Sequence, residues 1–501
     1  MTKHHQTANS AQIQFKLATV WQAKGQVERA LSGYRAAIAL QPDYIPPHLE
    51  LGNLLCQQGR LEEAIDVYRR ASALNPHEPG FAPKLAAVLA RKNAQETGSS
   101  PAMASAAAYH RPAANGPGHI LLYTDCPGIH GAEQCHHLLM LTWLAAGYHV
   151  TCAQSKADHH LIHERQQAGI QHLWLEPDDI YDNPNGASAF VNEAEAAWVF
   201  NTARPDLIVF SGGGPVSNLA AQQVAGRLGI PYIVIVHCVT ASWAKKFAAH
   251  LPKLPAVYQQ AESVIAVSQE NLDLLHSHFG LPPALGQVIY NGRPAAFFAP
   301  IDPTRRRQVR RALAIPEQAV VVFTSGRMEL VKGYQHQLKA IKQLKADPIW
   351  PRLYFMWAGT GTLEAQLRAV AAQLAAEDHI RFLGHHADVP ALLDAADIFV
   401  LPSHFEGMPL SVMEAMAKGL PVIATAVSGI VEELGDTGQL LPNPIDHPDG
   451  TINGLVATLA AWGADANLRA SVGRACRQRA EALFQIGPMT DHYLAIVRQT
   501  L

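Results

Sequence analysis

From residue 118 onward, the sequence alternates short apolar runs with amphipathic stretches of helical length. The runs are rich in β-branched residues and apolar throughout, which is typical of strands covered on both faces of a parallel sheet. They form two series of about 180 residues each, a length that suits one doubly wound domain. Strands are expected in HILLYTDC, YHVTCAQ, PDLIVFSGGG, YIVIVHCV and SVIAVSQ, and then in AVVVFTSG, LYFMWAGTG, HIRFLG, DIFVLPS and PVIATAV. The pattern predicts two facing, doubly wound Rossmann-like domains of the α/β class, joined at NGRPAAFFAPID.

A repeat precedes these domains. Residues 11–44 and 45–78 align without a gap at a period of 34 residues. The matched positions are Leu17 with Leu51, Ala18 with Gly52, Gly25 with Gly59, Ala30 with Ala64, Tyr34 with Tyr68, Ala37 with Ala71, Leu40 with Leu74 and Pro42 with Pro76. Small residues at helix crossings, a glycine turn and a closing proline make each unit resemble a tetratricopeptide repeat, a pair of amphipathic helices. Leu85 and Ala86 continue the register into a third unit that then fades.

Two units are fewer than the three or so that such arrays usually need for stability. We therefore expect the module to be stabilised by contacts with the rest of the chain or with another copy of the protein. Two interpretations stand side by side: a groove that binds a protein partner, or a packing and self-association element.

The predicted organisation has four parts. They are a tetratricopeptide-repeat helical module over 1–95, a flexible linker over 96–117, and Rossmann-like domains over 118–296 and 297–501. The linker is small, polar and proline-bearing, as flexible connections are. The last helix, HYLAIVRQTL, is expected to pack back on the first Rossmann-like domain.

Composition excludes several classes of protein. A formal charge of −3 argues against a general nucleic-acid binder. The six cysteines form no CxxC pair, and no apolar run approaches the roughly 20 residues of a membrane span, so a cytoplasmic protein is expected. Membrane contact would be peripheral at most, through SWAKKFAAHLPKL. No metal is expected, because the adjacent histidine pairs point in different directions and lack an accompanying carboxylate or cysteine set.

The strand AVVVFTS runs into GRMELVKG, which places Gly326, Arg327 and Lys332 on one loop. This edge of a parallel sheet is where ligands bind. Two cations there would hold a pyrophosphate and offset the charge on a departing diphosphate. The alternative is a solvated loop with two ordinary surface cations.

Two acids lie seven residues apart in the stretch HFEGMPLSVMEAMAKGLPVIAT. Glu406 precedes a helix that is predicted to begin with Pro409 and to end before Gly419. The free amides at Leu410 and the residue after it would seat phosphate oxygens. Gly407 lets the backbone approach a ligand.

The second acid, Glu414, lies roughly 7 Å along that helix. There its carboxylate would accept both hydroxyls of a ribose diol, while Glu406 would lie near a sugar. Alternatively, Glu406 complements the helix dipole and Glu414 makes a surface ion pair.

Four stretches together carry a family resemblance: FEGMPLSVMEAMAKGLPVIAT, SGRMELVKG, FLGHHADVPALLDAADIFVLPS and VIYNGRPAAFF. They resemble the retaining glycosyltransferases of the GT-B fold, family four, also called the group 1 glycosyl transferases. The resemblance covers 118–501. It implies an acceptor-side first domain and a donor-binding second domain. It also implies that no cofactor is needed beyond a nucleotide-diphosphate sugar, with uracil and guanine donors both open.

The resemblance also implies roles for individual residues. Catalytic roles are expected for Glu406, His237, Arg327 and Lys332. Donor binding is expected from Gly131, Gly326, Arg327, Lys332, His385, Glu406, Gly407, Met408, Pro409, Leu410 and Glu414. His237 ends the strand YIVIVH and matches a histidine beside the donor sugar, and His385 would help form the wall around the base. The loop CPGIHGAEQ departs from the family pattern, because His130 stands where the first of two glycines is usual.

These observations predict a retaining transferase that moves a hexose-type sugar to a hydroxyl of a glycan, a lipid-linked glycan or a protein. One alternative is an interaction protein, with the repeats as scaffold and a non-catalytic nucleotide-sugar-binding module. A sugar phosphorylase is a further alternative, but it would need inorganic phosphate and commonly a lysine-bound pyridoxal phosphate, for which the sequence shows no motif.

Overall fold

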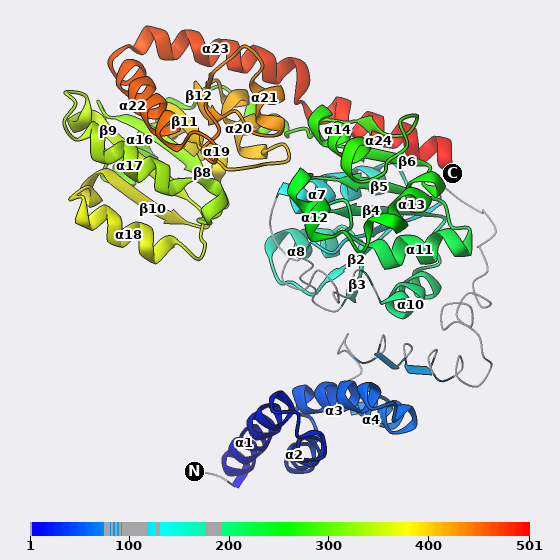
Figure 1. The fold of residues 1–501 in the computed structure, drawn as a ribbon. Coiled ribbons are helices and arrows are strands. Elements are labelled where there is room, and N and C mark those ends of the chain that lie inside the picture. Colours follow the sequence, from blue (N-terminus) through cyan, green and yellow to red (C-terminus); the bar gives the residue numbers. More distant parts are fainter. Residues whose placement is uncertain are drawn as a thin grey trace.

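The computed structural model describes residues 3–74, 118–126, 131–175 and 192–501, together with residues 81, 84, 85, 88, 89, 92 and 190. The predicted flexible linker over 96–117 and His130 lie outside the described residues. Figure 1 shows a helical N-terminal module followed by two α/β domains.

The N-terminal module contains the two predicted helix pairs. They are α1 (Lys3–Ala23) with α2 (Val27–Leu40), and α3 (Ile45–Gln57) with α4 (Leu61–Leu74). Gly25 and Gly59 turn the chain between the helices of each pair with φ values of +70° and +73°, where a side chain would be strained. A Cβ at Gly52 would lie 2.4 Å from the ring of Tyr68, so close helix crossing requires the small residue. The glycines matched at a period of 34 residues therefore lie at turns and helix crossings in the structure.

The first α/β domain is built on a parallel sheet. Its strands are β1 (His119–Tyr123), β2 (His149–Ser155), β3 (Gln171–Leu175), β4 (Leu207–Gly212), β5 (Tyr232–Val236), β6 (Ser263–Ala266) and β7 (Gln287–Val288). Their order is β3-β2-β1-β4-β5-β6-β7, and every pairing is parallel.

Helices cover both faces of this sheet, as a parallel sheet requires. They include α7 (Gly131–Ala145), α8 (His160–Gln167), α10 (Glu193–Ala203), α11 (Leu219–Leu228), α12 (Ala241–Lys246), α13 (Leu254–Gln260) and α14 (Gln269–His278). Alternate residues of β1 enter different cores: Leu121 belongs to one, and Ile120 and Leu122 to the other. This alternation places a hydrophobic core on each side of the strands.

The second α/β domain repeats this plan. Its strands are β8 (Val320–Ser325), β9 (Leu353–Ala358), β10 (Ile380–Gly384), β11 (Ile398–Leu401), β12 (Val422–Thr425) and β13 (Gln439–Leu441), in the order β10-β9-β8-β11-β12-β13, all parallel. Its helices include α15 (Ala295–Phe298), α16 (Pro303–Ala312), α17 (Tyr334–Leu344), α18 (Glu364–Gln373), α19 (Val389–Ala395), α20 (Leu410–Lys418), α21 (Gly429–Leu434), α22 (Pro448–Ala464) and α23 (Ala466–Leu483). The predicted fold class is confirmed.

The final helix, α24 (Ile486–Thr500), lies with the first domain (Figure 1). Met489, Tyr493 and Val497 join the core that contains Ile120 and Leu122. The chain therefore returns to the first domain after completing the second. The boundary predicted at 296/297 falls inside the short helix α15, between the last strand of one sheet and the first of the other.

The expected strands omit β3, β7 and β13, which are edge strands of their sheets. An edge strand is covered less completely than a central one, so its sequence need not be apolar throughout. Gln171–Leu175 begins with two polar residues, and Gln287–Val288 is only two residues long.

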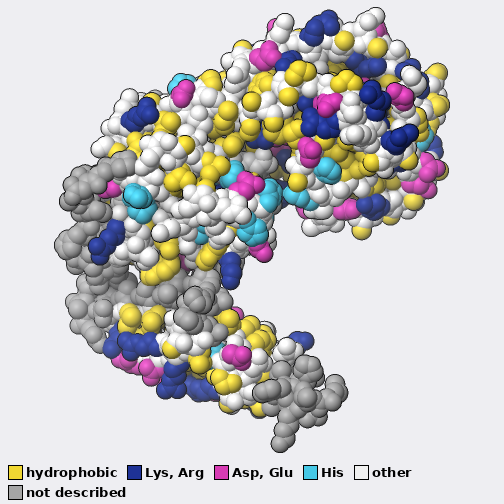
Figure 2. All heavy atoms as spheres, turned by 180° about the vertical axis from the view of Figure 1, so that it is seen from behind, with side chains coloured by type: hydrophobic (Ala, Val, Ile, Leu, Met, Phe, Trp, Pro, Cys, Tyr) yellow, Lys and Arg dark blue, Asp and Glu magenta, His cyan; other side chains and the backbone are white. Residues whose placement is uncertain are grey.

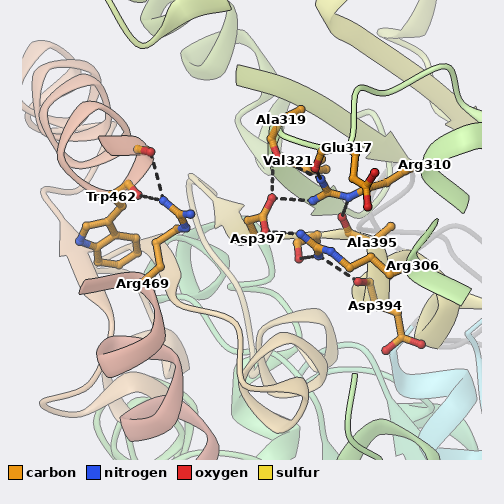
Figure 3. A network of polar contacts seen from close by, with 12 residues as sticks. Arg306, Arg310, Glu317, Ala319, Val321, Asp394, Ala395, Asp397, Trp462 and Arg469 are labelled. Atoms are coloured by element: carbon orange, nitrogen blue, oxygen red, sulfur yellow. Dashed lines mark hydrogen bonds and ion pairs between the residues drawn. The ribbon is translucent and has the colours of Figure 1, made fainter. Parts of the chain in front are cut away.

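An ionic network fastens the second domain at the end of its sheet where β8 and β11 begin (Figure 3). Asp397 accepts hydrogen bonds from Arg306 at 2.6 Å, from Arg310 at 2.7 Å and from the backbone amide of Val321 at 2.7 Å. Arg310 also donates to the carbonyl of Ala395 at 3.0 Å, which precedes β11. Helix α16 is thereby tied to two strands at once.

We predict that Asp397→Asn destabilises this domain. Arg310 is 3% exposed, and the substitution leaves its buried charge without a carboxylate, which costs about 3 kcal/mol when one partner of such a pair is removed. Thermal unfolding followed by circular dichroism should show a midpoint several degrees lower. Asp436→Asn, at an exposed loop position, is the control. Equal midpoints for the two variants would contradict the role of the network.

Candidate functional site

The two domains touch through backbone where β5 and β11 end. A Cβ placed on Gly407 would lie 1.8 Å from the carbonyl oxygen of His237, so no side chain fits between the two segments. The amide of Gly429 donates to the carbonyl of Gly407 at 3.0 Å, and a Cβ on Gly429 would lie 2.2 Å from that oxygen. Two predicted site residues from different domains are thus in direct contact.

Glu406 lies beside this junction and is 8% exposed. Its Oε1 accepts from Lys332 Nζ at 2.6 Å and from the Ser403 hydroxyl at 2.7 Å. Its own amide donates to Ser428 Oγ at 3.3 Å. The structure therefore brings together two of the predicted catalytic residues, as a largely buried ion pair.

The loop after β8 carries the predicted cations. Gly333 has φ +74°, and a Cβ there would lie 1.9 Å from the carbonyl oxygen of Pro402, so the loop packs tightly against the end of β11. Gly326 lies over the side chain of Lys332, and a Cβ on this glycine would be 3.6 Å from Lys332 Cδ. Arg327 is exposed. Lys332 faces inward to a carboxylate, while Arg327 faces solvent.

Helix α20 begins at this junction. Leu410 is its first residue, and a Cβ on Gly131 would lie 3.5 Å from Leu410 Cγ. Since Gly131 is the first residue of α7, the N-termini of two helices from different domains face each other. Free amides and helix dipoles at such ends favour anions.

Pro409 occupies the N-cap of α20, with extended backbone at φ −73° and ψ 116°, rather than the predicted first helical position. The difference is one residue. Met408 before it is 5% exposed and packs in the core of the second domain. Gly419 ends the helix at φ +82°, as expected.

Glu414 lies deeper in the protein than expected. It is 5% exposed, and its Oε1 lies 2.5 Å from the guanidinium of Arg293, so the alternative of a surface ion pair is wrong. Burial raises the pKa of Glu414, and the charge and hydrogen bond of Arg293 oppose that shift. Arg293 also donates to Gln134 of α7 at 3.0 Å and lies 4.6 Å from the ring of Phe297.

Sequence reasoning missed Arg293, although it quoted the crossing segment NGRPAAFF that contains it. It also missed Glu432, whose carboxylate accepts from the amide of Gln269 at 2.7 Å and from the hydroxyl of Tyr290 at 2.5 Å. Both residues link the domains. Glu432 could have been recognised from its position, because its segment, SGIVEEL, follows β12 at the same edge of the sheet as the other site residues.

His237 is 8% exposed, and its Nε2 lies 3.0 Å from Ser211 Oγ. Burial, and then the neighbouring His136, lower the pKa of His237 to about 3, so its ring is neutral at physiological pH. His385 is exposed on the other side of the junction, with its ring centroid 6.5 Å from that of His160 in the first domain.

The space-filling view shows histidine side chains gathered around the hollow between the two α/β domains (Figure 2). Within the described ranges, no three histidine, cysteine, aspartate or glutamate side chains form a group that could hold a metal ion. In the same part of the chain, no helix is both long and apolar enough to cross a bilayer.

Family models match both α/β domains and the repeats. The model described as Glycosyl transferases group 1 matches residues 305–479, and that described as Glycosyltransferase Family 4 matches residues 129–297. A TPR repeat model matches residues 52–93.

Curated relatives agree with these models. A D-inositol 3-phosphate glycosyltransferase of Jonesia denitrificans is 31% identical over 305 residues, which are 57% of this chain and 70% of that protein. The putative colanic acid biosynthesis glycosyltransferase WcaL of Salmonella typhimurium is 30% identical over 46% of this chain and 56% of that protein. The chain thus spans between 56% and 70% of the length of these relatives.

Solved structures share the fold. HepE of Anabaena, solved in complex with UDP and glucose, superposes with a TM-score of 0.63 at 21% identity, over 76% of this chain and 99% of that one. The chain belongs to the group 1, family 4 glycosyltransferases of the GT-B fold and carries an N-terminal tetratricopeptide-repeat module.

One buried acid beside the site has no hydrogen-bond partner among the described residues. Glu433 is fully buried, and neither carboxylate oxygen is bonded. Burial, followed by the negative charges of Glu406 and Glu432, raises the pKa of Glu433 well above its usual value, and Lys332 opposes the shift. The protonated form of this side chain is therefore favoured more than that of a solvent-exposed glutamate.

We predict that Glu433→Gln changes the pH dependence of stability. A raised folded-state pKa means that the native chain holds a proton which the unfolded chain releases above about pH 4.3. Stability of the wild type should therefore fall relative to the variant as pH rises from 4 to 8. Thermal unfolding across this range should show similar midpoints at the acid end and a more stable variant at pH 8. A constant difference would contradict the raised pKa of Glu433.

Proposed function

We propose that the protein transfers a hexose-type sugar from a nucleotide-diphosphate sugar to an acceptor hydroxyl, with retention at the anomeric carbon. The observation that carries the proposal is the contact between Lys332 and Glu406, 2.6 Å apart, beside the helix end at Leu410. Positive charge, a carboxylate and free helix amides meet there at the junction of two domains. Membership of the glycosyltransferase family supports the same chemistry.

The diphosphate would lie between the N-termini of α20 and α7, where Leu410 and Gly131 face each other. Arg327 is exposed and free to approach phosphate oxygens, whereas Lys332 would bridge the diphosphate and Glu406. Both cations would stabilise negative charge as the sugar–phosphate bond breaks. Closure of the domains would exclude water from the reacting bond.

Glu406 would hold the sugar by its hydroxyls, because a carboxylate fixed by Lys332 and Ser403 still accepts hydrogen bonds on its remaining lone pairs. In the front-face reaction, the bond from the anomeric carbon to phosphate breaks while the bond to the acceptor oxygen forms on the same face. The leaving phosphate oxygen takes the acceptor proton. Glu414 would accept the ribose diol, with its position set by Arg293.

The donor base is uracil or guanine in this proposal. HepE, which shares the fold at 21% identity, was solved with UDP and glucose, and this complex is the support for a uridine donor. His385 would contribute to the wall around the base. No cofactor is proposed beyond the donor itself.

The acceptor hydroxyl belongs to a glycan, a lipid-linked glycan or a protein. One relative is named D-inositol 3-phosphate glycosyltransferase and another is named for colanic acid biosynthesis, and both names support a carbohydrate-like acceptor. The repeat module favours delivery of the acceptor by a protein partner or by self-association. The free thiols of Cys126, Cys135, Cys152, Cys238 and Cys476 support a cytoplasmic location, where thiols stay reduced.

We predict that a thermal-shift panel of UDP, GDP and their sugars identifies the donor. One nucleotide should raise the unfolding midpoint of the wild type, and Lys332→Ala should lose most of that shift because a cation that binds phosphate is removed. A charge-assisted contact contributes about 1.5–3 kcal/mol, so binding should weaken about tenfold or more.

Lys342→Ala, an exposed lysine on α17, is the matched control and should keep the wild-type shift. Release of nucleotide from the donor sugar then separates an enzyme from a non-catalytic binding module. If no nucleotide shifts the midpoint at millimolar concentration, the transferase assignment of this site is wrong.

A further inference from the structure

Three apolar side chains are exposed along one face of α1, the first helix of the repeat module. Ile13, Leu17 and Val20 are 52%, 42% and 48% exposed. Their spacing of four and then three residues places them on one side of the helix. None of the three belongs to the hydrophobic core of the module. These three residues are called the α1 stripe below.

The α1 stripe faces away from α2, the partner helix in the first repeat unit. Ala18 marks the side of α1 that meets α2, because a Cβ on Gly33 of α2 would lie 2.9 Å from Ala18 Cβ. Ala18 is fully buried there. The packing of α1 on α2 therefore leaves the stripe uncovered. Figure 1 shows α1 at the end of the helical module away from α4.

The same stripe recurs in the next two units, where it is covered. A shift of 34 residues carries it onto α3, and a second shift carries it onto the helical residues 81, 85 and 88. Five of the six equivalent side chains are buried, and the sixth, Leu85, packs against the same hydrophobic core: Pro47, Leu51 at 2% exposure, Leu54 at 3%, Phe81 at 0% and Val88 at 5%.

In the second unit, the stripe is covered by the unit that precedes it. Helix α3 turns Gly52 toward α4, because a Cβ there would lie 2.4 Å from the ring of Tyr68. The stripe residues of α3 lie on its other side, and α2 packs against α3. Each unit of a repeat array contacts only its neighbours, and an end unit usually carries a polar outer face. The α1 stripe is therefore an apolar stacking face with no neighbouring helix in the part of the chain that the structure describes.

We infer that two copies of this chain associate through the α1 stripe, with α1 of one copy packed antiparallel on α1 of the other. The surface that covers this stripe within the chain is a helix of the same module, and a second copy supplies such a helix. A two-fold axis at Leu17 also makes the stripe self-complementary. Such a closed pair covers both stripes, whereas a head-to-tail contact would leave one stripe exposed at the end of each assembly.

Charge favours the antiparallel arrangement. Lys24 lies one turn beyond Val20, on the same side of α1. In an antiparallel pair this lysine lies toward Ser10 of the partner subunit, because the two residues are equally far from Leu17 in the sequence. A parallel pair would bring the two Lys24 side chains together, and like charges on neighbouring helices repel each other.

The association goes beyond the proposed function and does not depend on it, because neither donor nor acceptor takes part. Sedimentation velocity of the full chain without nucleotide tests it, in a series from about 1 μM to about 100 μM, where contacts of weak to moderate affinity are detected. The mass should rise with concentration from 54.3 kDa toward twice that value. A chain that stays monomeric throughout the series would overturn the inference and leave the stripe to a different protein.

Leu17→Glu tests the position of the contact. The dissociation constant should rise about 100-fold or more, because a charge would have to leave water at the centre of the contact. Leu74→Glu is the matched control: Leu74 is a leucine of similar exposure at the end of α4, outside the stripe, and this variant should associate like the wild type. Circular dichroism at low concentration should give both variants the wild-type unfolding midpoint, since both replaced side chains are exposed. Association of Leu17→Glu, or loss of association in both variants, would overturn the inference.

A charge swap tests the two-fold axis itself. Leu17→Glu and Leu17→Lys should each be monomeric alone, because like charges face each other at the axis. An equal mixture of the two should regain the mass of a pair, since residue 17 of one copy then meets the opposite charge on residue 17 of the other. A head-to-tail contact predicts no such rescue, so a mixture that stays monomeric would overturn the two-fold arrangement.

Discussion

The two α/β domains meet through bare backbone, and the rest of the site depends on that contact. At Gly407 there is no room for a side chain beneath the carbonyl of His237, and Gly429 closes on Gly407 in the same way. Because no side chain fits into this contact, the backbone segments of the two domains approach each other directly in this structure. Glu432 adds hydrogen bonds from the second domain to Gln269 and Tyr290. A site shared by two domains gains its geometry from such contacts rather than from either sheet alone.

Buried acids around this contact are held in contrasting ways. Glu406 is paired with Lys332, and Glu414 with Arg293. A cation beside a buried carboxylate offsets part of the free-energy cost of removing that charge from water. Among the described residues Glu433 has no such ion pair, and burial raises its pKa well above the usual value. The site thus contains buried carboxyl groups both with and without a cation partner.

Much of the fold could be predicted from the sequence. Central strands are apolar on both faces, so a short β-branched run such as VVVF, bounded by turn residues, indicates a buried strand. The edge strands were not predicted, because a strand that is partly exposed to solvent need not be apolar throughout, as at Gln171–Leu175. Pro409 was misplaced by one residue because a proline fits either the N-cap or the first helical position. The burial of Glu414 could not be predicted, because its ion-pair partner, Arg293, comes from a segment that is distant in the sequence.

By itself, the sequence determined the helical repeats, the two parallel sheets, and the loops and helix that carry Arg327, Lys332, Glu406 and Glu414. These features follow from periodicity, glycine and proline positions and local helix chemistry, which act between neighbours in the chain. Tertiary structure decided that Lys332 faces Glu406, that Glu414 is paired with Arg293, and that Ser211 joins His136 to His237. The members of each pair lie at least 26 residues apart in the chain. Hydrogen bonds and ion pairs act over a few ångströms, so only the packing of helices against sheets, and of one domain against the other, determines which side chains meet.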